Sequence, residues 1–129
     1  MIFPFVAAGL LLLTAFAIHL FMGTKEYSAI MPSKDEKHFV QWAMGAGAFQ
    51  MVTVDLLLTG VFALMLGLEI IEYNFHLALF ITLIYAGYLI AWLAALTALR
   101  VRTSLYKSLG QWTIFLAALA LMGCGIIMQ

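Results

Sequence analysis

Charged residues and cysteine are scarce in this sequence of 129 residues, and each shortage excludes a class of protein. Only 9% of the residues are charged and 66% are hydrophobic, whereas soluble domains carry about 25% charged residues. So few polar side chains cannot cover a water-exposed surface, which argues against a soluble globular domain. The single cysteine, Cys124, excludes a disulfide within the chain and a thiolate metal cage.

Net charge is absent as well. Six Lys and Arg residues balance six Asp and Glu residues, so the formal charge is zero. Binding to nucleic-acid phosphates requires a surplus of basic residues. We therefore expect no nucleic-acid partner.

Apolar residues fill four long runs, separated by the places where charges gather. At 1.5 Å per residue, each run is long enough to cross a hydrocarbon layer of about 30 Å as a helix. The runs do not alternate polar with apolar residues, which argues against a β-barrel. The sequence predicts an all-α fold in one domain over residues 1–129, a four-helix transmembrane bundle with helices at about 2–22, 34–68, 75–99 and 109–128.

The expected start of the second helix depends on a local signal. Pro32 stops any preceding helix, and Ser33 with Glu36 three residues later matches a capping box. Asp35 would also be favoured at the positive end of the helix. We therefore place the start near Lys34, although the apolar run begins only at Phe39.

The basic residues predict the orientation. All six belong to the first and third connections, and the second connection contains only Glu69 and Glu72 as charged residues. Basic loops are retained in the cytoplasm. We expect a multi-pass protein of an inner or plasma membrane, arranged up-down-up-down, with both termini on the non-cytoplasmic side and these residues facing the cytoplasm: Lys25, Lys34, Lys37, Arg100, Arg102 and Lys107.

Small residues recur at helical spacing, which in lipid allows helices to approach closely. The third run has Gly87, Ala91 and Ala95 at four-residue steps. These faces have two interpretations, packing within the chain or contact with a neighbouring subunit. The other small-residue pairs are Ala43 with Gly47, Gly45 with Ala48, and Ala120 with Cys124.

Asp55 is the carboxylate that most needs explaining, because it lies in the middle of an apolar run. A carboxylate at the centre of a membrane helix costs at least about 2.5 kcal/mol. If the second and third helices fold back on each other, Asp55 lies at the depth of Tyr85 and Tyr88, and Thr59 at the depth of Thr82. Three interpretations stay open: a hydrogen-bonded residue that fixes helix register, a proton relay, or a pair with a basic residue of another chain.

His19 is the second polar candidate, near the cytoplasmic end of the first helix. It is expected either to hydrogen-bond across helices or to shuttle protons. Its expected neighbours at that depth are Gln50 and, if the helices tilt, Thr97, Gln111 and Thr113.

A metal site near the cytoplasmic connection is a weaker idea. His19, Glu26 and His38 are the candidate ligands, with Asp35 and Glu36 nearby. Histidine and carboxylate suit zinc or iron, but no metal-binding spacing such as HxxxH or ExxH occurs. We predict no metal.

No hydrolase or phosphate-binding motif occurs, so the sequence does not indicate an enzyme. We expect an accessory or structural subunit of a homo-oligomer or of a larger membrane complex, in contact with the lipid bilayer. One alternative is a small proton-coupled transporter or channel that uses Asp55. Another is a membrane enzyme acting on a lipid or quinone. No cofactor is predicted, although a lipid or quinone ligand stays open.

Overall fold

The computed structural model describes residues 1–34, 37–102 and 110–129. The regular secondary structure within these ranges is entirely helical. Three helical segments are long and apolar enough to cross a membrane, Phe3–Ala29, Phe39–Gly67 and Phe75–Ala98, and a shorter apolar helix covers Gln111–Ile127. The predictions of an all-helical chain and of apolar, membrane-type helices are confirmed at this level.

The first helical segment is longer than expected. It comprises α1 (Phe3–Ile18), a π-helical turn η1 (His19–Gly23) and α2 (Thr24–Ala29) in one continuous run. The expected end was near Met22, where the apolar run stops. Lys25, Glu26 and Ala29 in the segment that follows are good helix formers, and the helix ends only as the chain approaches Pro32, which disfavours helical backbone in the residue before it.

Helix α3 (Phe39–Gly67) begins five residues after the expected start at Lys34. Asp35 and Glu36 lie outside the described residues, so the proposed capping box cannot be followed there. The N-cap is His38, and its side chain makes no capping hydrogen bond. Helix α2 continues to Ala29, so only residues 30–38 of the sequence separate it from α3.

Two aromatic residues join α2 to the start of α3. The hydroxyl of Tyr27 donates a hydrogen bond of 3.2 Å to the carbonyl oxygen of Trp42, and Nε1 of Trp42 donates one of 3.3 Å to the carbonyl oxygen of Tyr27. Their rings stack with centroids 5.5 Å apart. The register between these two helices is thus fixed at their ends as well as along their apolar faces.

The last two helices lie close to their expected positions. Helix α4 (Phe75–Ala98) is capped by Asn74, whose Oδ1 accepts a 3.0 Å hydrogen bond from the backbone N–H of Leu77. Such a cap satisfies one of the free N–H groups at a helix start. Helix α5 covers Gln111–Ile127. Residue 109, the expected start of that helix, lies outside the described residues.

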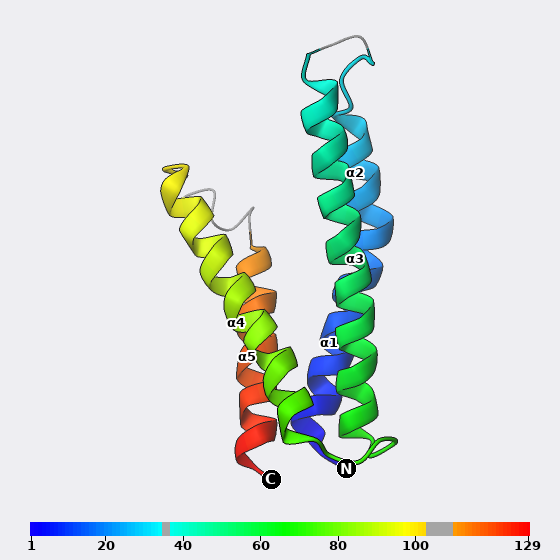
Figure 1. The fold of residues 1–129 in the computed structure, drawn as a ribbon, viewed down its shortest axis with the longest axis vertical. Helices are drawn as coiled ribbons and strands as arrows, with labels where there is room; N and C mark the ends of the chain where they lie inside the picture. The colour runs from blue at the N-terminus through cyan, green and yellow to red at the C-terminus, as the bar shows by residue number, and fades with distance from the viewer. Residues whose placement is uncertain (35–36, 103–109) are drawn as a thin grey trace.

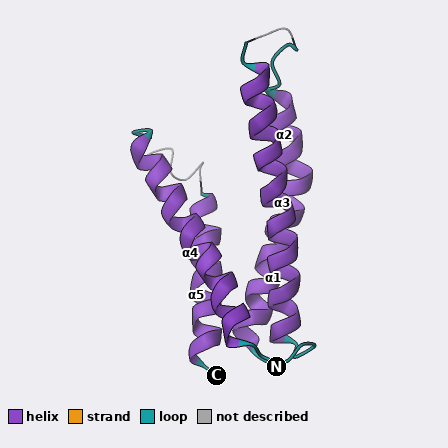
Figure 2. Cartoon of the chain, in the orientation of Figure 1, coloured by secondary structure: helices purple, strands orange, loops and turns teal. Residues whose placement is uncertain are grey.

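The helices form two packed pairs, α1 with α3 and α4 with α5, and α1 also packs on α5. Figure 1 shows the pairs meeting near the chain termini and diverging towards the ends of α2 and α4. Figure 2 shows the short loop between α3 and α4 at the end where the pairs meet. The core lies in this half of the molecule, and its largest fully buried side chains are Phe5, Leu12, Leu66, Tyr85 and Met122.

Glycines set the close contacts between helices. A Cβ atom placed on Gly9 of α1 would lie 2.8 Å from the backbone nitrogen of Leu64 and 2.9 Å from the carbonyl oxygen of Gly60, both in α3. A Cβ on Gly67 would meet the backbone of Val6, and one on Gly125 would meet the ring of Phe5. Only glycine permits these approaches.

Packing within the chain and contact with a neighbouring subunit were both open for the small-residue faces, and most of these faces make no close contact within the described residues. A Cβ on Gly87 or Gly47 would have nothing within 4 Å, and Ala91 and Ala95 are exposed. Gly45 accommodates only the hydroxyl of Tyr27. Spacing alone could not distinguish these faces from those of Gly9, Gly60 and Gly67, because it does not tell which side of a helix faces its neighbour. The remaining expected small residues are also exposed: Ala43, Ala48, Ala120 and Cys124.

Candidate functional site

Asp55 occupies the middle of α3 and is half-buried. The hydroxyl of Tyr88 on α4 is the hydrogen-bonding neighbour of its carboxylate. The oxygen Oδ2 is buried and has no hydrogen-bond partner. A buried carboxylate oxygen without a partner is costly and therefore marks a place where another group is expected to bind.

A hydrogen bond between Thr59 and Tyr85 also joins α3 to α4, one helical turn from Asp55. The hydroxyls of Thr59 and Tyr85 lie 2.6 Å apart. Thr59 donates its single hydroxyl hydrogen to the carbonyl oxygen of Asp55 at 2.7 Å. The Tyr85 hydroxyl therefore acts as donor to Thr59. Asp55, Thr59, Tyr85 and Tyr88 thus form one polar cluster, which we call the Asp55 cluster.

Aromatic rings surround the tyrosines of the cluster. The rings of Tyr85 and Tyr88 meet edge to face with centroids 5.7 Å apart, and Phe115 of α5 lies 5.7 Å from Tyr88 and 6.3 Å from Tyr85. Trp92, one turn further along α4, lies 6.4 Å from Phe115. The cluster therefore borders on an aromatic wall built from α4 and α5.

Thr82 does not join the cluster, although its expected depth matched that of Thr59. It is buried, and its hydroxyl donates to the carbonyl oxygen of Ala78, one turn earlier in its own helix, at 2.7 Å. Thr59 is paired with Tyr85 instead. A hydroxyl satisfied by its own helix needs no partner across the interface.

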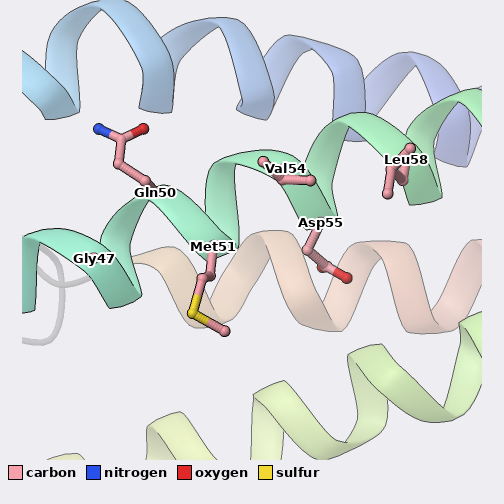
Figure 3. Close-up of a pocket in the computed structure, with 6 residues that line it drawn as sticks. All are labelled: Gly47, Gln50, Met51, Val54, Asp55 and Leu58. Atoms are coloured by element: carbon pink, nitrogen blue, oxygen red, sulfur yellow. The ribbon is translucent and has the colours of Figure 1, made fainter.

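A pocket of about 500 Å³ opens beside Asp55 on the surface of α3, and all of its lining residues belong to that helix. Figure 3 shows Met51 and Asp55 projecting from one side of α3, in the direction of α4 and α5, whereas Gln50 projects towards the opposite side. The wall is otherwise apolar. Its lining residues are Gly47, Gln50, Met51, Val54, Asp55 and Leu58.

His19 forms a separate site at the π-helical turn η1. Its Nδ1 lies 2.9 Å from Oγ1 of Thr53, and its ring stacks on Phe49 with centroids 3.8 Å apart and planes 16° apart. Gly23 leaves room for the ring of Phe49. The sequence analysis missed Thr53 and Phe49. Their four-residue spacing on α3 was the available signal, because it places them on one helix face.

The other expected neighbours of His19 bond elsewhere. Gln50 is exposed, and its amide donates to Oγ1 of Thr24 at 3.4 Å. Thr97 donates to the carbonyl oxygen of Leu93, Thr113 donates to that of Gly110, and Gln111 is exposed. His19 lies against α3, whereas these three residues belong to the pair α4 and α5, which diverges from α1 and α3 at that end of the molecule (Figure 1).

The described residues contain no group of three or more His, Cys, Asp or Glu side chains close enough to hold a metal ion. Glu26 and His38 are exposed. Asp35 and Glu36 lie outside the described residues.

Comparison with protein families, with curated proteins and with solved structures found no match to this chain. The function is therefore inferred from the arrangement of its own side chains.

Proposed function

We propose that the protein is a small proton-coupled membrane transporter or channel in which Asp55 gains and loses the coupled proton. The observation that carries this proposal is the buried, unpartnered Oδ2 of Asp55 beside an open pocket. Carboxylates inside membrane helices are rare and commonly belong to ion or proton pathways.

A purely structural role explains the Asp55 cluster less well. A residue that only fixes helix register is expected to have both carboxylate oxygens satisfied, because a partly satisfied polar network is less stable than an apolar contact. Tyr88 is the neighbour of the carboxylate on α4, and the buried Oδ2 has no hydrogen-bond partner. A proton or a bound substrate group would satisfy that oxygen.

The proposed arrangement in the membrane has four crossings, with both termini outside and the basic connections in the cytoplasm. The positive-inside rule supports this orientation. In Figure 1 the pairs diverge towards the ends of α2 and α4, and Lys34 and Arg100 follow these two helices in the sequence. The helix pairs would then be apart at their cytoplasmic ends and in contact at their outer ends, as expected for one state of an alternating-access protein.

Sidedness is tested by impermeant thiol labelling of intact cells in a Cys124→Ser background. Single cysteines replace Glu72 and Lys34, and both native residues are exposed. Labelling from outside at position 72 and only after permeabilisation at position 34 agrees with the proposal. Labelling of both positions from the same side contradicts it.

Coupling is tested in proteoliposomes that contain the purified protein and a pH-sensitive dye. We expect proton flux in response to an imposed gradient, loss of that flux in Asp55→Asn, and full flux in the matched control Glu72→Gln. Flux that persists in Asp55→Asn, or absence of flux from the native chain, would refute the proposal.

A second candidate function, an accessory subunit of a homo-oligomer or larger membrane complex, is favoured by the α4 face of Gly87, Ala91 and Ala95. This face makes no close contact within the described chain. Small-residue faces of this kind commonly bind another helix. Gly87→Leu would then shift the complex to smaller species in native electrophoresis, whereas Gly123→Leu on α5, also in open space, would not.

A further inference from the structure

We propose that the pocket beside Asp55 binds a lipophilic organic cation, the substrate whose passage the proton exchange drives. This inference rests on the proposed function and adds the chemical class of the substrate. It is carried by the shape of the pocket, its composition and the position of one carboxylate.

The size and lining of the pocket suit one apolar molecule. Its volume of about 500 Å³ lies within the range of about 300–1,000 Å³ that is usual for small-molecule sites. Met51, Val54 and Leu58 supply its apolar wall. Methionine adapts its shape to irregular ligands, which suits a site for bulky apolar groups.

The charge in the pocket favours a cation. Asp55 is the only acidic residue in α1, α3, α4 and α5, and none of these helices contains a Lys or Arg. The chain therefore has no cation of its own at this depth to pair with the carboxylate. A ligand with one positive charge would supply the missing partner for Oδ2, whereas an anion would be repelled and a neutral ligand would leave the charge unpaired.

The aromatic wall adds a second preference for positive charge. Tyr88, Phe115 and Trp92 lie in successive ring contacts on the α4 and α5 side of the Asp55 cluster. Aromatic faces attract cations, and the attraction grows when water is excluded. A cation at the carboxylate would lie near Tyr88, and its apolar substituents would contact the apolar wall of the pocket.

Proton and cation would compete for the same carboxylate. Binding of one monovalent cation to Asp55 releases the proton that the carboxyl held, so one charge enters and one leaves. The titratable groups that face Asp55 are Tyr85 and Tyr88 of α4. Helix α5 presents no acidic, basic or tyrosine side chain, and His19, after α1, is bound to Thr53.

Equilibrium binding of tetraphenylphosphonium to the full chain in mild detergent tests this assignment. We expect saturable binding with release of one proton per cation in weakly buffered solution. Asp55→Asn should weaken binding by at least about tenfold, since it removes one member of a desolvated charge pair. Met51→Trp, which fills the pocket and keeps the carboxylate, should weaken binding similarly, and Glu72→Gln should leave it unchanged.

Three outcomes would overturn the inference: equal binding by Asp55→Asn, equally tight binding of the neutral triphenylphosphine oxide, and no binding by the native chain. If the native chain binds no cation but shows proton flux that depends on Asp55, the cation site is rejected and the proposed function is retained. Asp55-dependent binding with proton release but without flux would support the cation site and remove transport.

Discussion

Helix α3 has two very different neighbours. Against α1, the backbones approach so closely at Gly9 and Gly67 that added Cβ atoms would collide, and Gly60 packs tightly against the side chain of Leu13. Against α4, the contact is small and includes the hydrogen bonds of the Asp55 cluster. One face of the helix is thus built for permanent packing, and the opposite face carries polar groups beside open space.

This difference indicates which interface is expected to move. Close backbone packing is hard to rearrange without losing many contacts. A few hydrogen bonds between α3 and α4 can be exchanged at little cost, because such bonds in membranes contribute only about 0.6 kcal/mol each on average. Motion of the pair α4 and α5 relative to α1 and α3 would therefore change access to Asp55 while each pair stays intact.

The largest expected effect comes from breaking the tight interface. In Gly67→Leu the new Cβ collides with the backbone of Val6, which cannot move aside as a side chain can. We expect the free energy of unfolding to fall by at least about 2 kcal/mol, measured by denaturant titration of the detergent-solubilised protein. Gly123→Leu is the control, because its Cβ meets nothing within 4 Å. Equal losses in both variants would contradict the assigned interface.

The loose interface predicts a smaller effect. Thr59→Val and Tyr85→Phe each remove one side of the 2.6 Å hydrogen bond between α3 and α4. A double-mutant cycle on the free energy of unfolding should give a coupling of about 1 kcal/mol. Thr82→Val with Tyr85→Phe should give no coupling, because Thr82 bonds within its own helix. A coupling at Thr82 as large as at Thr59 would rule out the observed pairing.

The smallest effect is expected at the π-helical turn. His19→Phe preserves a ring that stacks on Phe49 and removes the 2.9 Å contact with Thr53. The unfolding free energy should fall by about 0.5 kcal/mol. Thr53→Val added to His19→Phe should cost nothing further if the two side chains act only on each other. An additional loss comparable to the first would show that Thr53 has another role.

The helices were predictable because hydropathy and local signals set them. The bounds of α4 lie within one residue of the expected ones, with Asn74 as its cap. The first helix was drawn too short, because the polar residues after Met22 mark the end of an apolar run and not the end of a helix. The start of α3 was placed too early, because a capping pattern in the sequence carries no information about where the neighbouring helix lies.

The Asp55 cluster was predictable in part. Folding two helices back on each other gives the depth of each residue, which brought Asp55 together with Tyr85 and Tyr88. Depth does not give the direction in which a side chain points, so Thr82 was wrongly paired with Thr59. For the same reason, the sequence did not predict the contact of His19 with Thr53 or the exposure of the small-residue face at Gly87.

Infrared difference spectroscopy of the protein in lipid, recorded between acid and alkaline pH, observes the exchange of a proton at Asp55 most directly. We expect a protonated-carboxyl band that disappears as the pH rises, is missing from Asp55→Asn and persists in Glu72→Gln. A band that is insensitive to pH, or one that is unchanged in Asp55→Asn, would show that Asp55 does not exchange a proton and serves only to join α3 to α4.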